Sequence, residues 1–291
     1  MGTKEETAIN MSRQLYSFTD KLTPQDQQFF ELVKSCNLPA IEKYLKTNSV
    51  NINMKYQGDT PLHLAIKNQC EPLVDLILQQ KGVNIGDSML LAITYDNLKL
   101  LDRLLEFEET NGRANSRGRG SGWKRMEPSP YGSSHDDDND SEEFPRFMTP
   151  LLLATQCGLY ETVEYLLNRG HTLDRPHPPR CTCDERCAAA AKRGEVVTDG
   201  CERLNAYWAI SNPAFICTTS TISDPVLWCF QLRDELLRCG SEEQVYKGTY
   251  TSMAEQVHIE RQRLFRKRIK NPKILCPTGN FSRQIFWLTI L

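Results

Sequence analysis

The feature that most constrains the fold is an internal repeat with a period of 33 residues. Apolar positions of one segment recur at that spacing in the next, with Phe29, Val33, Ile41 and Leu45 corresponding to Leu62, Ile66, Val74 and Leu78. A period of this length marks one supersecondary unit, which cannot bury its hydrophobic face alone and must stack on its neighbours. The sequence therefore predicts a solenoid of stacked units.

The start of the second unit indicates the kind of repeat. Residues 60–65 read Thr-Pro-Leu-His-Leu-Ala, close to the T-P-L-H-x-A signature of ankyrin repeats, which share this period. Thr60 is expected to cap a helix, and Pro61 takes the first helical position, where a missing N–H costs nothing. His63 is expected to make a structural hydrogen bond at this turn. Small Ala65 allows the paired helices to approach closely.

Two further units follow in the same register. The corresponding positions are Ala65, Ala92 and Ala154, then Val74, Leu101 and Val163, then Leu78, Leu105 and Leu167. Thr149-Pro150 restores the signature in the last unit, and the third unit is six residues shorter, which predicts a trimmed hairpin finger. We predict an all-α ankyrin-repeat solenoid of about four repeats over residues 25–176, preceded by a flexible tail at residues 1–24.

An insertion at residues 109–147 separates the third unit from the fourth. It contains the glycine-rich stretch 117–122 and the acidic run 136–143, and it has too little apolar surface to order itself. The acidic run could be a weak calcium or partner site, but such runs are more often solvated loops. Trp123 is the exception, and we expect it to dock on the repeats.

Directly after the repeats, one short segment carries four potential metal ligands: His177, Cys181, Cys183 and Cys187. Zinc takes thiolate and imidazole ligands in tetrahedral sites. His171 or Cys201 could replace one ligand, although Pro178-Pro179 stiffens the span from His177 to Cys181. Because four protein ligands leave no position for water, the zinc would be structural and would staple a loop at residues 177–201. The alternative is a loop with incidental thiols.

Composition argues against several functional classes. The net charge of −2 gives no sign of a nucleic-acid binder, and no run approaches the roughly 20 apolar residues of a membrane helix. The N-terminus lacks the apolar core of a secretory signal, so the cysteines outside the cluster are expected to be reduced, without a disulfide framework. No phosphate-loop, dinucleotide or nucleophile motif is found, so we predict that the chain is not an enzyme.

Residues 202–257 are predicted to form linker helices. Asp224-Pro225 is an N-cap with proline at the first helical position, Gly240 is expected to end that helix, and residues 242–257 form the next one. Such apolar helices need the repeats or another chain to cover them. The residues expected to contact a partner are Tyr207, Val226, Leu227, Phe230, Leu236 and Leu237.

The last segment, residues 258–291, changes character. Residues 258–273 carry seven Lys/Arg and one Glu. A basic stretch beside apolar residues can bind an anionic membrane surface weakly. The alternative, which we favour, is an unstructured tail.

The order of these motifs is more specific than any one of them. The repeats are followed by Arg169-Gly-His171, the His/Cys cluster, Arg203-Leu-Asn-Ala-Tyr207 and Ser223-Asp-Pro-Val-Leu227. From about Gln25 to Val257 the chain resembles the N-terminal cytoplasmic region of TRPC-type transient receptor potential cation channels. The resemblance implies a tetrameric, calcium-permeable, nonselective channel opened downstream of phospholipase C, with this region under the plasma membrane and packed between subunits. It also implies zinc on His177, Cys181, Cys183 and Cys187.

Two departures from that family pattern matter. Three residues separate Cys183 from Cys187 where the family usually has two, and after Val257 the chain turns basic without membrane spans.

We interpret the chain as an assembly or regulatory module of a TRPC-like channel, truncated before the spans, with other channel subunits as partners. A free-standing ankyrin scaffold and a zinc enzyme are the alternatives. A polar, exposed helix surface after Arg203 would favour the scaffold, and a zinc ion with three protein ligands and water would favour the enzyme.

Overall fold

The computed structural model describes residues 23–115, 143–145, 147–181, 183, 187–188, 192 and 196–270. These residues form helices and turns, with one isolated bridge between Tyr56 and Asp59 and no strand among them, which confirms the all-α prediction. No helix in these ranges has the length and hydropathy needed to cross a membrane. Trp123, residues 136–142 of the acidic run and the tail at residues 1–22 lie outside the described residues.

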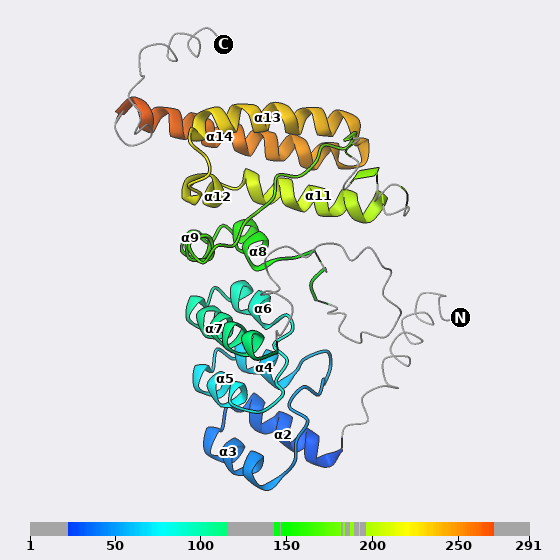
Figure 1. Cartoon of the computed structure of the whole chain (residues 1–291), viewed down its shortest axis with the longest axis vertical. Helices are drawn as coiled ribbons and strands as arrows, with labels where there is room; N and C mark the ends of the chain where they lie inside the picture. Colours follow the sequence, from blue (N-terminus) through cyan, green and yellow to red (C-terminus); the bar gives the residue numbers. More distant parts are fainter. Residues whose placement is uncertain are drawn as a thin grey trace, which may run out of the picture. The chain divides into compact units, whose positions relative to one another are not determined.

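The chain divides into two compact units, residues 1–148 and 149–291, which are drawn in Figure 1. Unit 1 contains three helix pairs, namely α2 (Pro24–Lys34) with α3 (Leu38–Thr47), α4 (Pro61–Lys67) with α5 (Glu71–Leu78), and α6 (Ser88–Thr94) with α7 (Leu98–Asn115). The first helices contact one another in the order α2, α4, α6, and the second helices in the order α3, α5, α7. Like helices therefore stack on like helices, as in a solenoid.

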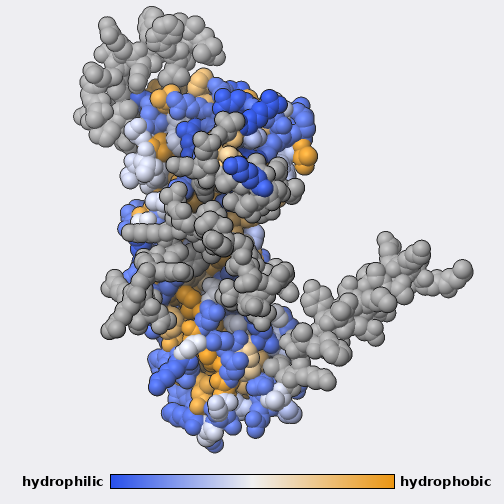
Figure 2. Space-filling model, turned by 45° about the vertical axis from the view of Figure 1, so that its right-hand side comes forward, coloured by the Kyte–Doolittle hydropathy of each residue, from blue (hydrophilic) through white to orange (hydrophobic). Residues whose placement is uncertain are grey.

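The predicted repeat positions form the core of this stack. Phe29, Val33 and Ile41 and their counterparts Leu62, Ile66 and Val74 are at most 1% exposed, and Ala65 and Ala92 are completely buried. The face seen in Figure 2 is mostly hydrophilic in both units, with hydrophobic side chains in smaller groups between the hydrophilic ones. The periodic apolar positions are therefore buried within the stacked helices.

Threonine and proline start three of the first helices. The hydroxyls of Thr23, Thr60 and Thr149 each accept a hydrogen bond from the backbone N–H three residues later, at 3.2 Å. His63 contributes its backbone N–H to this turn, while its Nδ1 lies 3.8 Å from Asp59 Oδ1. The third repeat begins at Asp87, whose side chain makes no cap hydrogen bond. As predicted, the connection before this repeat is short: it spans residues 79–87, whereas the connection one repeat earlier spans residues 48–60.

The turn between the two helices of each pair uses a left-handed residue at one fixed position. Cys36, Gln69, Asp96 and Gly158 have φ of 50°, 52°, 50° and 71° at equivalent places in the four pairs. Only glycine adopts this conformation without a steric penalty. The fourth repeat therefore has the relaxed version of a turn that the other three make under strain.

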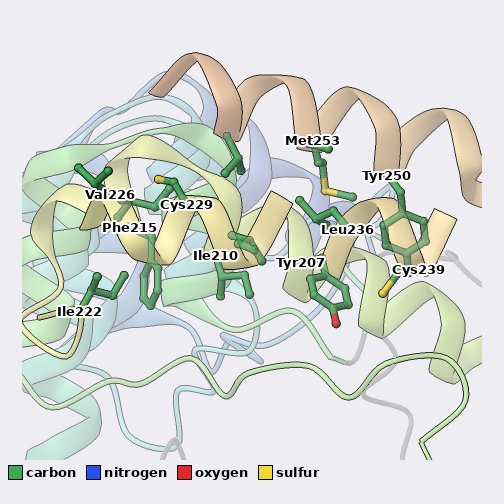
Figure 3. Packing of buried hydrophobic residues seen from close by; sticks show 14 of the residues in the cluster. Tyr207, Ile210, Phe215, Ile222, Val226, Cys229, Leu236, Cys239, Tyr250 and Met253 are labelled. Carbon is green, nitrogen blue, oxygen red and sulfur yellow. The ribbon is translucent and has the colours of Figure 1, made fainter. Parts of the chain in front are cut away.

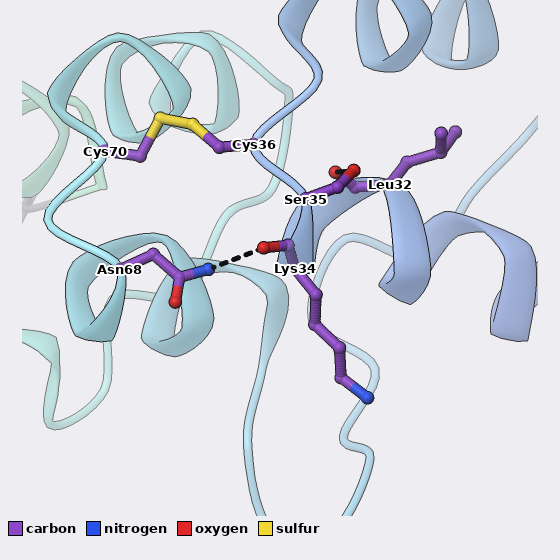
Figure 4. The surroundings of a disulfide bond; sticks show 6 residues. All are labelled: Leu32, Lys34, Ser35, Cys36, Asn68 and Cys70. Atoms are coloured by element: carbon purple, nitrogen blue, oxygen red, sulfur yellow. Dashed lines mark hydrogen bonds between the residues drawn. A yellow bond between two sulfur atoms is a disulfide. The ribbon is translucent and has the colours of Figure 1, made fainter.

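Two of these turns contain a disulfide, which corrects the expectation that the cysteines outside the cluster are reduced. Cys36 and Cys70 form a disulfide with their Cα atoms 6.6 Å apart, where the sequence led us to expect reduced thiols (Figure 4). Cys36 lies in the turn after α2, and Cys70 precedes α5 in the next repeat, so stacking brings the two turns together. Beside the disulfide, Asn68 Nδ2 donates to the Lys34 carbonyl oxygen at 3.2 Å.

Helix α7 runs further than the repeat pattern predicted. It continues to Asn115, so the first residues of the expected disordered insertion, 109–115, are helical. At the other end of the insertion, Glu143 lies 3.7 Å from Lys67, measured from Oε2 to Nζ. The part of the insertion between these points, residues 116–142, lies outside the described residues.

Unit 2 begins with the fourth repeat, α8 (Pro150–Cys157) and α9 (Tyr160–Asn168), and continues through α11 (Val196–Ser211), α12 (Pro213–Thr218), α13 (Pro225–Glu242), the short 3₁₀ helix η1 (Gln244–Tyr246) and α14 (Lys247–Lys270). Helix α11 contacts α8, and α12 contacts α9. The first linker helices thus stack on the fourth repeat as the helix pairs of unit 1 stack on one another, which the sequence pattern did not reveal.

Helices α13 and α14 lie side by side and pack on α11 (Figure 1). Their shared core contains Tyr207 and Tyr250, whose rings meet edge to face at 5.9 Å (Figure 3). Gly240 does not end α13 as predicted, because the helix continues to Glu242. Its lack of a side chain serves packing instead, since a Cβ there would lie 3.2 Å from the Cβ of Tyr250.

Helix α14 also shows that the expected unstructured tail at residues 258–291 is helical in its first part. It does not end near Val257 but continues to Lys270. Within the expected tail, Glu260 and Leu264 are each only 4% exposed. Arg268 Nη1 lies 3.1 Å from Oδ2 of Asp224, the residue that caps the start of α13. The antiparallel pairing therefore gives the basic segment a packed face and a partner for its last buried cation.

We predict that Gly158→Ala lowers the free energy of unfolding of unit 2 by about 1 kcal/mol, because alanine is strained at positive φ. Urea denaturation followed by far-UV circular dichroism checks this. A new Cβ at Gly158 would come no closer than 4.0 Å to Asn212, so the effect reports the backbone alone. Gly248→Ala, in the open first turn of α14, is the matched control and should be neutral or stabilising. Equal effects of the two changes would contradict the prediction.

Candidate metal centre

An extended segment connects the fourth repeat to the cysteine cluster. Helix α9 ends in a turn where Gly170 N–H donates to Leu167 O at 2.9 Å and His171 N–H donates to Leu166 O at 3.1 Å. Residues 171–178 then run without regular structure, and the Cys181 N–H donates to Pro178 O at 3.0 Å. Two successive prolines fix the backbone φ angles just before the first cysteine. The local sequence thus restricts how His177 and Cys181 can be placed.

Two side chains hold this segment against the linker helices. Leu173 packs on the hydrophobic core of unit 2. Arg175 forms an ion pair with Glu235 of α13, and its guanidinium lies 5.3 Å from the ring centroid of Trp228. The chain leading to the cluster is therefore fixed by contacts with a helix about 60 residues further along the sequence.

Glu235 also binds Tyr207 of α11. The Tyr207 hydroxyl donates to Glu235 Oε1 at 2.6 Å, and the Glu235 side chain is only 11% exposed. Burial, followed by the neighbouring Glu235 carboxylate, raises the pKa of Tyr207, so the hydroxyl remains a donor. One carboxylate thus connects α11, α13 and the segment before the cluster. Charge-assisted bonds of this kind are among the stronger ones in proteins.

A second polar contact set lies one to two turns away along the same helices. Arg203 of α11 pairs with Glu243, which follows α13, and Glu243 Oε2 accepts from the Tyr250 hydroxyl at 2.8 Å. On the side of the fourth repeat, Gln156 Nε2 donates to Asn205 Oδ1 at 2.9 Å. The Asn-Ala-Tyr element of α11 therefore has a structural role, because Asn205 binds the fourth repeat and Tyr207 binds α13.

The structure brings together the four residues that the sequence proposed as metal ligands. His177 Nδ1 lies 3.3 Å from Cys181 Sγ and 3.3 Å from Cys183 Sγ. The four possible ligand atoms, those of Cys187 included, all lie within 4.8 Å of one another, and each residue is half-buried. Cys187 joins the cluster although its spacing from Cys183 is longer than the family pattern.

The cluster fits a tetrahedral metal ion by its donor set and its size. Zinc, with Zn–S near 2.3 Å and Zn–N near 2.0 Å, separates neighbouring ligand atoms by roughly 3.5–3.8 Å. The observed separations approach these values, so shifts of about 1 Å or less would complete the shell. Four protein ligands would then close the shell to water. The cluster could therefore hold a metal ion in a structural role.

The closeness of the three thiols determines their protonation when no metal is bound. Burial, and then the neighbouring thiols of Cys183 and Cys181, raise the pKa of Cys187 to about 12. Three thiols this close cannot all ionise without a counter-charge. A bound dication would supply that charge and would favour the thiolate form of the three cysteines.

The two alternative ligands are not part of this cluster. Cys201 Sγ lies 3.5 Å from the hydroxyl of Tyr246, in the linker-helix core. His171 lies in the turn after α9 and is absent from the group of ligand atoms that meet, among the residues that the structure describes. The geometry favours His177 and Cys187 over these two residues.

The residues proposed for partner contact divide into two groups. Tyr207, Val226 and Leu236 are at most 2% exposed and lie in the core of unit 2 (Figure 3), which corrects their assignment as contact residues. The chain covers them with its own helix α14. Leu227 and Leu237 are 47% and 41% exposed. Phe230 is half-buried, and the Arg261 guanidinium lies 5.7 Å from its ring centroid.

Sequence reasoning missed Glu235 and Arg175. A signal was present, because Glu235 lies between Leu232 and Leu236 on the apolar face of a predicted helix. A carboxylate at such a position is buried only when a donor or cation meets it. The sequence could have predicted that Glu235 has partners but not that they are Tyr207 and Arg175, which come from separate segments.

Comparison with protein families identifies both parts of the chain. The ankyrin repeat matches at residues 57–88 and 147–177, and the transient receptor ion channel II domain matches at residues 181–247. The second match begins at the first cysteine of the cluster and ends at the first residue of α14. In the sequence, this channel-associated domain directly follows the fourth repeat.

Individual relatives agree with the family matches. Mouse short transient receptor potential channel 3 is 30% identical over 244 residues, which is 81% of this chain and 25% of that protein. The Drosophila melanogaster transient receptor potential protein is 31% identical over 241 residues, which is 81% of this chain and 17% of that protein. The chain therefore spans a quarter or less of the length of these relatives.

We predict that Glu235→Ala lowers the free energy of unfolding of unit 2 by about 2–3 kcal/mol, because it leaves the buried Tyr207 hydroxyl without its acceptor. Asp234→Ala, which removes the adjacent and 53% exposed carboxylate, should change the free energy by less than about 0.5 kcal/mol. Urea denaturation measures both.

A double-mutant cycle separates this contact from other effects. If Glu235 acts through the Tyr207 hydroxyl, then Tyr207→Phe with Glu235→Ala costs less than the sum of the two single changes. Additive effects, or equal effects of Glu235→Ala and Asp234→Ala, would show that the carboxylate does not connect the two helices.

Proposed function

We propose that the chain is an assembly and regulatory module of a TRPC-like channel. It combines ankyrin repeats with a transient receptor ion channel II domain. It is similar to transient receptor potential channels over about 80% of its length, which is consistent with an N-terminal TRPC-type region. The match at residues 181–247 carries the proposal, since ankyrin repeats alone occur in proteins of many functions. Neither matched family is an enzyme family.

In this proposal the module belongs to a tetrameric, calcium-permeable, nonselective cation channel and acts on the cytoplasmic side of the plasma membrane. Its partners are other channel subunits. The helix pairs of unit 1 provide a stack surface, and the linker helices of unit 2 provide a second surface. On α13, exposed Leu227 and Leu237, together with half-buried Phe230, are the residues through which it contacts another subunit.

We further propose that the His/Cys cluster binds one structural zinc ion. Three thiols and one imidazole suit zinc better than calcium or magnesium, which prefer oxygen ligands. His177 and Cys181 would hold the ion from the segment that Arg175 attaches to α13, and Cys187 would hold it from the chain that leads to α11. The metal would then join the repeats to the linker helices and contribute folding free energy on the order of 10 kcal/mol to this segment.

The zinc proposal predicts about one zinc ion per chain by elemental analysis of the purified protein. Cys183→Ala should reduce the bound zinc at least several-fold after dialysis against a weak chelator, because it removes one of four ligands. Chelation of the wild-type protein should lower its unfolding temperature.

The matched control is Cys157→Ala, a change in an exposed cysteine of α8 outside the cluster. It should retain the zinc content of the wild type. Equal zinc in the Cys183→Ala and wild-type proteins would exclude the assigned ligand set, and a folded wild-type protein without metal would exclude a structural zinc.

The assembly proposal predicts that the chain is pulled down with a full-length relative, such as mouse short transient receptor potential channel 3, when the two are co-expressed. It should also change the current of that channel. Leu227→Glu with Leu237→Glu should weaken the association several-fold, because charges would replace exposed apolar contacts.

Gln231→Glu places the same charge on an exposed position of α13 between the two leucines and should leave the association unchanged. Absence of both association and current change would count against the channel role. If the chain then captured a defined partner in the cytosol, the free-standing ankyrin scaffold would replace it.

A further inference from the structure

The outward face of the last part of α14 carries cations between two exposed isoleucines. Ile259, Arg263, Arg266 and Ile269 follow one another at steps of three or four residues, which places them on one side of an α-helix. Ile259 and Ile269 are 65% and 67% exposed. We call these residues, together with exposed Lys267, the outer face of α14.

The opposite side of the helix is fully used by the fold. Val257 and Leu264 belong to the core of unit 2, and Arg268 pairs with Asp224 at the start of α13. Packing against α13 therefore fixes the rotation of α14 about its axis. It makes the outer face a defined surface, whereas an unstructured basic tail would not order its cations.

The cations of the outer face are mostly uncompensated. Arg263 is the exception, because it lies 3.3 Å from the buried Glu260 carboxylate and donates to the Tyr160 hydroxyl, although its side chain remains 54% exposed. Arg266 and Lys267 are exposed and have no ion pair with any acidic group in the part of the chain that the structure describes. Glu255 lies on the same side one turn before Ile259, so the basic character is confined to the C-terminal turns of the helix.

We propose that the outer face of α14 binds the surface of a membrane that contains anionic phospholipids. Arginine and lysine side chains meet lipid phosphates, arginine through two parallel hydrogen bonds, and each cation near such a surface adds to the attraction. The two isoleucines enter the boundary between headgroups and acyl chains, where apolar side chains at the end of a basic patch are stabilised. This proposal does not depend on the channel role of the chain.

Other partners fit this face less well. A protein that binds amphipathic helices in a groove needs a continuous apolar stripe, but the apolar stripe of α14 is covered by α13. Nucleic acid would meet the cations but would leave both isoleucines in water. A flat anionic surface with an apolar layer beneath it uses both kinds of side chain.

The experiment measures co-sedimentation of the full-length chain with lipid vesicles. We expect binding to phosphatidylcholine vesicles that contain about 30 mol % phosphatidylserine, little binding to pure phosphatidylcholine, and loss of binding as NaCl rises towards about 0.5 M. Arg266→Gln with Lys267→Gln should reduce the partition coefficient roughly tenfold or more. Ile259→Ser with Ile269→Ser should reduce it several-fold without changing its salt dependence.

Lys247→Gln is the matched control, because it removes an exposed cation from the other end of the same helix. Binding of this variant should equal that of the wild type, and circular dichroism should show all variants equally helical. Equal binding to neutral and anionic vesicles, or unchanged binding of the Arg266→Gln/Lys267→Gln variant, would overturn the proposal. So would binding to a duplex oligonucleotide without binding to anionic vesicles, since it would identify nucleic acid as the partner.

Discussion

Unit 2 depends on the carboxylate of Glu235, which has two partners from separate segments. It accepts the hydrogen bond of the Tyr207 hydroxyl and pairs with Arg175, so it ties α11 and the segment before the cluster to α13. The carboxylate is almost fully buried, and burying a charge without such partners would be strongly unfavourable. Any arrangement of these helices that separated the three side chains would leave a buried charge and a buried hydroxyl unsatisfied.

The His/Cys cluster lies in the same connection between the fourth repeat and the linker helices. Its first ligand, His177, comes just after Arg175, and its last, Cys187, precedes α11. Ion pairing and core packing therefore bring the segment to the linker helices, and a metal ion would fix the remaining loop. The four candidate ligand side chains can therefore lie close together although they are half-exposed, because residues outside the cluster hold the backbone before it.

The stacking rule of the repeats extends beyond the repeats themselves. Helices α11 and α12 lie on α8 and α9 as the repeats of unit 1 lie on one another, and the pair α13 and α14 then packs on α11. In capped solenoids a terminal element covers the last apolar face and presents a polar surface outward. Here α14 packs on α13 and α11 and presents a basic surface outward.

By itself the sequence determined what depends on local spacing: the 33-residue stack with its Thr-Pro helix starts, and the close set of one histidine and three cysteines. Such spacing decides which side chains share a helix face or a loop. Only the tertiary structure decided what covers each face. It buried Tyr207, Val226 and Leu236, joined Cys36 to Cys70, and continued α14 to Lys270. These outcomes depend on contacts between segments far apart in the chain. Burial and ion pairing in such contacts outweigh the local helix and turn propensities, and they leave no periodic signal in the sequence.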